Sequence, residues 1–148
     1  SPEMLATIDE LILQGTVLDA TLLIFERYDS EPENSMRLRW ASNFTKLAHD
    51  AGVKVAAGTD DQGTPLAGKL PNIHDELERL VDTAGLSNLE AITAATYHGA
   101  IALGIEERTG LVRPNFYADL LLLHDDPTLD IRNTRKIAHV IKHGQLLR

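Results

Sequence analysis

Two adjacent carboxylates, Asp60 and Asp61, follow a short apolar segment and are the residues of this chain best suited to chemistry. The segment 53–57 is rich in valine and alanine and has a glycine on each side, which predicts a buried strand. In α/β folds, ligands bind just beyond the carboxyl ends of parallel strands. Both acids would therefore lie where a metal ion or a proton transfer could use them. Asp and Gly are also ordinary turn residues, so the pair could equally cap a loop.

The composition limits the functions that the chain can have. Its 148 residues are 43% hydrophobic and 24% charged, which is ordinary for a globular domain. There is no cysteine, so any metal ion must be held by His, Asp or Glu. The formal net charge is -8 and no basic block is present, which argues against a nucleic-acid partner. We expect a cytoplasmic protein without a membrane partner, because no apolar run could span a bilayer and no signal peptide is visible.

Helical and strand patterns alternate over the first hundred residues. We predict helices over 1–14, 36–51, 72–84 and 87–103, and strands over 16–25 and 53–58. Ser87 and Glu90 have the spacing of a capping box at the start of the last helix. The helix over 36–51 carries an apolar stripe that we expect to be buried, formed by Met36, Trp40, Phe44, Leu47, Ala48 and Ala51. This alternation favours a parallel sheet wrapped by helices, which is an α/β fold.

The pattern changes after Gly110. Short β-like segments over 110–112, 118–123 and 136–142 are separated by turn signals. They predict a small antiparallel β unit over roughly 109–148, attached to the α/β part.

Four stretches between residues 53 and 148 follow one another in a specific order. They are Gly58-Thr-Asp60, His74-Asp-Glu-Leu-Glu-Arg-Leu-Val81 with Ala84-Gly-Leu-Ser87, Glu90-Ala-Ile-Thr-Ala-Ala-Thr96, and Thr109-Gly-Leu-Val-Arg-Pro114 continuing to Val140-Ile-Lys-His-Gly144. Taken together, they resemble the metal-dependent amidohydrolase superfamily, in particular its imidazolonepropionase-like and Xaa-Pro or Xaa-Arg dipeptidase-like branch.

The resemblance implies a (β/α)8 TIM-like barrel flanked by a small β-sandwich. Residues 1–108 would form the C-terminal units of the barrel, with strands seven and eight at 16–25 and 53–58. Residues 109–148 would form the C-terminal strands of the sandwich. A full barrel takes about 250 residues, and the family's metal-binding histidines have no counterpart here. We therefore expect the N-terminal barrel portion to lie upstream of Ser1 and the chain to be inactive alone.

The resemblance also implies a role for Asp60. It matches the family's strand-eight aspartate, which contacts the metal, takes a proton from metal-bound water and passes it to the leaving group. The implied cofactor is one or two divalent ions, zinc in first place, with most ligands outside this chain. The implied reaction is hydrolysis of amide or cyclic-amide C–N bonds in a small-molecule or dipeptide-like substrate. Asn115 replaces a glycine of the family pattern, and asparagine tolerates the left-handed conformation that this turn needs.

Two further residues are candidates for substrate binding. His74 begins a helix near the expected mouth of the site, with a capping or surface role as the alternative. Asp19 interrupts a predicted strand that should end at the same face, with a paired structural acid as the alternative. We expect Asp61 to be a loop residue that points away from Asp60, and His98 to be a packed structural residue.

Two other classes of function stay open. A two-strand piece of a barrel exposes sheet edges and an apolar face, so the chain could be a non-catalytic α/β domain that works by association. A homo-oligomer is expected as well. The third possibility is a magnesium-binding or phospho-acceptor domain that uses Asp60 and Asp61, with Asp19 as the only other acid at a strand end.

Overall fold

The computed structural model describes residues 1–27, 29, 35–60 and 70–147. Asp61 and its predicted loop role lie outside these residues. The helices are α1 (Pro2–Gln14), α2 (Leu22–Arg27), α3 (Met36–Asp50), α4 (Ile73–Asp82), α5 (Asn88–Thr93), the π-helix η2 (Ala94–His98), α6 (Gly99–Leu103) and the 3-10 helix η3 (Ile131–Arg135). The strands are β1 (Val17–Asp19), β2 (Lys54–Ala56), β3 (Leu120–Leu123), β4 (Ile137–Lys142) and β5 (Gln145–Leu146).

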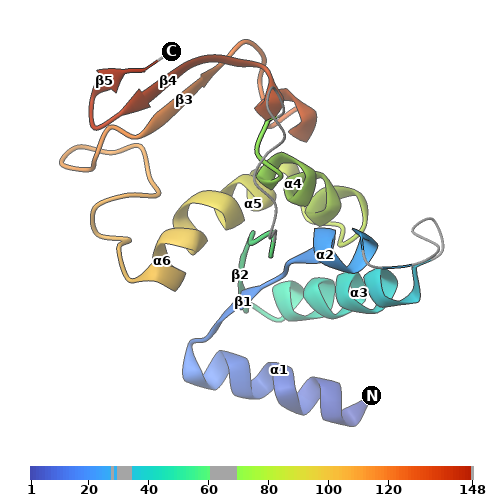
Figure 1. The fold of residues 1–148 in the computed structure, drawn as a ribbon. Coiled ribbons are helices and arrows are strands. Elements are labelled where there is room, and N and C mark those ends of the chain that lie inside the picture. The colour runs from blue at the N-terminus through green and yellow to red at the C-terminus, as the bar shows by residue number, and fades with distance from the viewer. Residues whose placement is uncertain (28, 30–34, 61–69, 148) are drawn as a thin grey trace.

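The strands form two separate sheets. β1 and β2 pair in parallel, with Leu18 opposite Val55, and this confirms the predicted parallel arrangement. β3, β4 and β5 form an antiparallel sheet in that order, which confirms the predicted C-terminal β unit and adds one short strand to it. In Figure 1 this sheet lies at one end of the molecule and α1 at the other, with β1 and β2 between them.

One apolar cluster joins the α/β part to the segment that leads into β4. Its buried members come from β2, η2, η3, the helices α2 to α5 and the segments beside them, and they include Leu22, Leu38, Val55, Leu80, Ala91, Ala94 and Ile131. A smaller cluster around Ile8, Ala48 and Val53 packs α1 against α3 and the parallel strands. The core therefore holds β1 and β2 from several sides and fixes where these strands end.

The predicted strand over 16–25 is wrong beyond Asp19. β1 ends there, and α2 begins at Leu22. The backbone N–H groups of Leu22 and Leu23 donate to the carboxylate of Glu76 on α4, which satisfies donors that a helix start leaves open. A contact more than fifty residues away thus overrides the local preference of this β-branched segment for a strand.

The helix over 36–51 has the predicted extent, but its buried face differs from the prediction. Met36 is 80% exposed and Trp40 is 59% exposed, and the Trp40 ring stacks on Phe44 with centroids 5.6 Å apart. The residues that α3 buries are small or polar for the most part: Leu38, Ala41, Ser42, Thr45 and Ala48. The apolar stripe predicted to enter the core therefore lies largely at the surface of the described chain.

The predicted helix over 87–103 is one continuous segment with a π turn in its middle. The capping box of Ser87 and Glu90 is present as predicted. The predicted strand at 110–112 is wrong, because Gly110 adopts φ +89 and packs tightly against the π turn. A Cβ at Gly110 would lie 3.0 Å from the carbonyl oxygen of Thr96. Asn115 adopts φ 68, which confirms its predicted left-handed conformation.

Candidate active site

The carboxyl ends of β1 and β2 lie side by side and carry two of the predicted site residues. The register pairs Asp19 with Ala56, so both strands end at the same edge. Asp60 follows four residues after the end of β2 and is exposed. Its φ of 45 lies in the left-handed region, which is uncommon for a residue other than glycine. The register thus places Asp19 and the segment that leads to Asp60 at the same edge of the sheet.

The carboxylate of Asp19 holds the chain just after β2. Its Oδ1 accepts a hydrogen bond of 2.6 Å from the backbone N–H of Gly58. A Cβ at Gly58 would lie only 2.3 Å from both carboxylate oxygens, so this contact requires glycine. Asp19 is the last residue of β1 and is exposed, so it is not the acid within a buried strand that the pattern predicted. Its bond to Gly58 agrees with the alternative of a paired structural acid.

Glu76 is a further residue of this region that the sequence reasoning missed. Its side chain is 0% exposed, and its two oxygens accept the N–H groups of Leu22 and Leu23 at 2.8 and 2.7 Å. Burial raises the pKa of Glu76 to about 7, although the two backbone hydrogen bonds act in the opposite direction. A signal was available, because Glu76 lies one helical turn before the core residue Leu80. An acid on a buried stripe needs a partner.

His74 lies on the other side of α4 from Glu76. It is only 4% exposed, so the alternative of a surface role is wrong. Its Nδ1 lies 3.0 Å from the hydroxyl oxygen of Thr134, which itself donates to the carbonyl of Ile131, so the ring nitrogen is the donor. Burial lowers the pKa of His74, and the neighbouring Arg135 adds to this effect. Side chains two residues apart on a helix point about 200° apart, so His74 and the Glu76 contact with α2 face different parts of the molecule.

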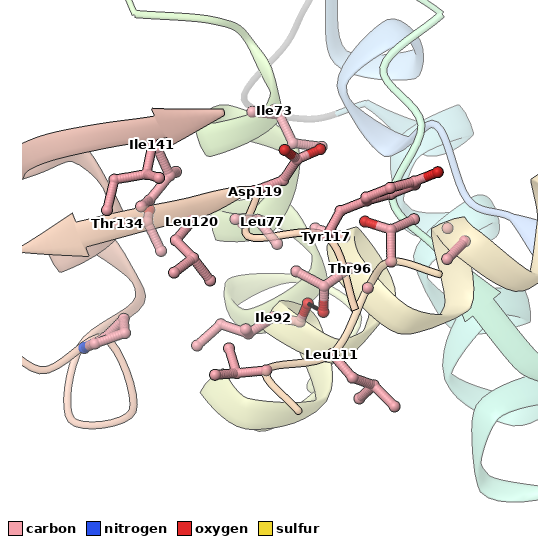
Figure 2. Close-up of a pocket in the computed structure, with 18 of the residues that line it drawn as sticks. Ile73, Leu77, Ile92, Thr96, Leu111, Tyr117, Asp119, Leu120, Thr134 and Ile141 are labelled. Carbon is pink, nitrogen blue, oxygen red and sulfur yellow. Dashed lines mark hydrogen bonds between the residues drawn. The ribbon is translucent and has the colours of Figure 1, made fainter. Parts of the chain in front are cut away.

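His74 lines an apolar cavity of about 750 Å³ between the helices and the antiparallel sheet. Figure 2 shows side chains of α4 and α5 on one side of this cavity and Leu120 and Ile141 of the sheet on the other. Asp119, an acid in its wall, accepts hydrogen bonds from the Nζ of Lys142 and the backbone N–H of His143. Neither Asp19 nor Asp60 is among the lining residues. The described structure thus does not place His74 together with the two acids at the strand ends.

The π turn supports β2 from a second direction. The Nδ1 of His98 lies 3.0 Å from the carbonyl oxygen of Val55 and donates to it, because a carbonyl can only accept. The N–H of Ala57 donates to the carbonyl of Ala94 at 3.3 Å. His98 is half-buried, and its bond to the strand confirms the predicted structural role. Segments of π-helix are frequent near functional sites, and this one fixes the strand that leads to Asp60.

The described residues do not form a metal site by themselves. Within the ranges given above, no group of three or more His, Asp or Glu side chains is arranged to hold an ion. Catalytic zinc sites use three protein ligands, and Asp60 could supply one carboxylate at the strand end. In the same residues, none of the helices has the length and apolar character needed to cross a membrane.

Three comparisons with known proteins bear on this geometry. The sequence model described as "Amidohydrolase family" matches residues 7–147. The chain is 35% identical over 103 residues to an ochratoxinase of Aspergillus niger, in a match covering 66% of this chain and 20% of the relative. Members of the matched family generally use divalent metal ions.

Solved structures show the same similarity over nearly the whole chain. A Xaa-Pro dipeptidase with methionine bound in its active site superimposes with a TM-score of 0.78 at 26% identity, covering 97% of this chain and 37% of the dipeptidase. The A. niger ochratoxinase superimposes with a TM-score of 0.79 at 26% identity, covering 95% of this chain and 34% of the ochratoxinase. The chain thus spans about a fifth of the length of its curated relatives and about a third of these solved structures.

Proposed function

The chain belongs to the amidohydrolase family, and from this we propose that it supplies the C-terminal barrel units of a metal-dependent amidohydrolase. Residues 1–108 would contribute β1 and β2 as the last two strands of a (β/α)8 barrel. Residues 109–148 would contribute strands to the accompanying β-sandwich. The remaining barrel units would come from a further N-terminal portion, which agrees with the share of the solved structures that the chain covers.

The observation that carries the proposal is the position of Asp60. It follows β2 at the edge where two parallel strands end together, and such edges are where α/β enzymes bind their ligands. Its carboxylate is exposed, while the backbone before it is held by Asp19 through Gly58. An accessible carboxylate on a fixed backbone can accept a proton from an attacking water and return it to a leaving nitrogen.

The proposed cofactor is a divalent ion, with zinc in first place and one or two ions bound. Such an ion would lower the pKa of a bound water to about 7. Asp60 would give it one carboxylate ligand, and most of the other ligands would lie outside this chain.

The proposed substrate class is a small amide, a dipeptide-like molecule or a cyclic amide, cleaved at its C–N bond. The dipeptidase and ochratoxinase neighbours support a small substrate. Asp19 is the better placed of the two candidates for contact with the substrate, because it lies beside the segment that leads to Asp60. His74 would have to act from the cavity between α4 and the antiparallel sheet.

The test is turnover of Xaa-Pro and other dipeptides by the complete enzyme that carries the substitution Asp60→Asn. We expect kcat to fall by about 100-fold or more, because the isosteric amide cannot accept the proton. Asp125→Asn is the matched control, since Asp125 is half-exposed and pairs with Lys136 on the surface. Turnover within about tenfold of wild type in Asp60→Asn would contradict the assigned role.

A second candidate function, non-catalytic association, is favoured by the exposed apolar side chains of α3. Met36 and Trp40 lie largely at the surface. In the described residues β1 pairs only with β2, so the outer edges of this sheet are open to another segment. Analytical ultracentrifugation of the isolated chain tests this candidate: self-association at micromolar concentration would support it and the expected homo-oligomer, and a stable monomer would contradict both.

A further inference from the structure

We propose that Glu76 is a positioning residue for Asp60, acting through the turn between β1 and α2 and through the carboxylate of Asp19. The proposal rests on the proposed function, because it gives Asp60 a catalytic role. Glu76 lies on α4, and its carboxylate accepts hydrogen bonds from Leu22 and Leu23 rather than contacting the segment that carries Asp60. Its influence passes along three structural links, beside the direct repulsion between its charge and that of Asp19.

The first contact joins Glu76 to the start of α2. Its two oxygens accept consecutive backbone N–H groups, those of Leu22 and Leu23. The side chain of Glu76 is fully buried on the same helix as Leu77 and Leu80, two members of the main apolar cluster. An apolar residue would leave the two N–H groups without an acceptor. The role of the Glu76 carboxylate is therefore to hold the backbone at residues 22–23.

The second link is a strained turn. Thr21, directly before Leu22, adopts φ 47, which is a genuine outlier for a β-branched residue. On its other side, the N–H of Ala20 donates to the carbonyl of Ala56 and continues the pairing of the parallel strands. Strained backbone persists where surrounding contacts over-determine it. Here Glu76 fixes one end of the turn and β2 fixes the other.

The third link leads from the turn to the candidate catalytic residue. Asp19 stands two residues before Thr21, and its carboxylate accepts the N–H of Gly58 at 2.6 Å. Hydrogen bonds to a charged acceptor are stronger than neutral ones, and this contact is too close for any side chain at position 58. Asp60, two residues later, also has a positive φ of 45. A shift of the turn would therefore move the backbone that aims the Asp60 carboxylate.

The experiment compares three variants of the complete enzyme. Glu76→Leu removes both acceptors, and Glu76→Gln keeps the shape with one acceptor oxygen. Leu80→Ala is the control, because Leu80 lies one turn further on α4 and is equally buried in the same cluster, but its side chain has no acceptor for the N–H groups of Leu22 and Leu23. The readouts are kcat, KM and amide hydrogen exchange of the peptides that contain Leu22, Leu23 and Gly58.

We expect Glu76→Leu to lower kcat by about 100-fold with KM changed less than about threefold, because a misplacement near 1 Å costs about this much. Exchange at residues 22, 23 and 58 should accelerate together. The kcat of Glu76→Gln should be at least about tenfold higher than that of Glu76→Leu. If the leucine variant does not fold, the glutamine variant alone is compared with the wild type. Leu80→Ala should keep kcat within about twofold, with unchanged exchange at Gly58.

The proposal is overturned if the Glu76 variants keep wild-type kcat and exchange at Gly58, or if Leu80→Ala loses as much kcat as they do. Failure of the proposed function has a different signature. In that case the wild type hydrolyses no amide, or Asp60→Asn stays active. Amide hydrogen exchange still tests the structural part of the proposal, because it shows whether residues 22, 23 and 58 are loosened together in the Glu76 variants.

Discussion

The two buried ionisable side chains of α4 serve two regions of the molecule that are built differently. Glu76 faces the strand-end region, defined here as residues 19–23 and 56–60, and it binds backbone N–H groups. His74 faces the junction region, defined as η3 and the part of α4 packed against it, and it binds the hydroxyl of Thr134. Glu76 thus binds main-chain groups, whereas His74 binds a side chain.

The junction region relies on apolar burial with ion pairs at its rim. Arg135 contacts Asp75 at 2.5 Å and Glu78 at 2.8 Å, and its own side chain is 31% exposed. Exposed and half-exposed pairs of this kind contribute little, about 0–1 kcal/mol each. Ile131, which is 1% exposed, belongs to the main cluster and packs η3 into the core. The comparison teaches that the region carrying Asp60 is held by carboxylates from distant segments, whereas at the start of η3 the carboxylate of Asp130 accepts the N–H of Arg132, only two residues further on.

The largest expected effect on stability lies in the junction region. Replacing Ile131 by alanine should lower the free energy of unfolding by about 2–5 kcal/mol, because it removes a fully buried side chain and leaves a cavity. In the complete enzyme, kcat per folded molecule should stay near the wild-type value. Urea denaturation and active-site titration measure the two quantities. A large fall in kcat would show that the two regions are not separate in function, and the comparison would be broken.

The next effect is a pH dependence of stability that arises at Glu76, the residue of α4 that faces the strand-end region. The pKa of Glu76 rises from its ordinary 4.5 to about 7 on folding, so the folded chain binds this proton more tightly than the unfolded chain does. Its contribution to stability is complete below pH 4.5 and is lost as the pH rises through about 7. The loss amounts to about 3 kcal/mol.

The measurement is urea denaturation of the wild type and Glu76→Gln between pH 4.5 and 8. The glutamine variant should lack this loss, so the difference between the two unfolding free energies should change with pH by about 3 kcal/mol. Because the other ionisable groups are the same in both proteins, the difference isolates the contribution of Glu76, which includes its repulsion from the charge of Asp19. Two parallel curves would mean that the carboxyl of Glu76 does not titrate on folding as described.

A smaller effect tests the close contact between the two strand ends. Gly58→Ala would place a methyl group 2.3 Å from the carboxylate oxygens of Asp19, so one of them must move. We expect a loss of about 1–3 kcal/mol in stability, as for other overpacked sites, together with a loss of kcat. The double variant Gly58→Ala with Asp19→Ala isolates the clash. If the two substitutions simply add, the contact does not determine the position of this segment.

The features that the sequence predicted are those with a local cause. The capping box at Ser87 and the left-handed turn at Asn115 depend on neighbouring residues, and both are present. The strand before Asp60 was predicted from its apolar run and flanking glycines, and the parallel pair from the alternation of elements. The role predicted for Asp60 did not come from a local pattern. It came from the order of several motifs along the chain.

The features that the sequence missed have a distant cause. α2 begins where Glu76, more than fifty residues away, accepts its N–H groups, and no local pattern shows this. Trp40 and Met36 were placed in the core because their spacing is helical, but α3 turns small side chains inward instead. Helical spacing defines a face without saying which neighbour will cover it. Tertiary contacts decide that, and they decide equally that His74 is buried against Thr134.

The smallest effect compares the strand-end region with a turn outside both regions, through one kind of backbone strain. Thr21 at the strand ends and Asn115 before β3 both have positive φ, and glycine adopts this conformation without a steric penalty. Thr21→Gly should raise the free energy of unfolding by up to about 1 kcal/mol, and Asn115→Gly by less, because asparagine tolerates this region better than threonine. Thermal unfolding of both variants measures these changes.

Activity then separates the two positions. A glycine at position 21 frees the turn that Glu76 and β2 hold, so we expect a more stable enzyme with a kcat lowered about two- to fivefold. A glycine at position 115 should leave kcat unchanged, because Asn115 lies outside the strand-end region. If Thr21→Gly gains stability and keeps full activity, the strain at this turn is incidental, and Asp60 is aimed by β2 and the π turn alone.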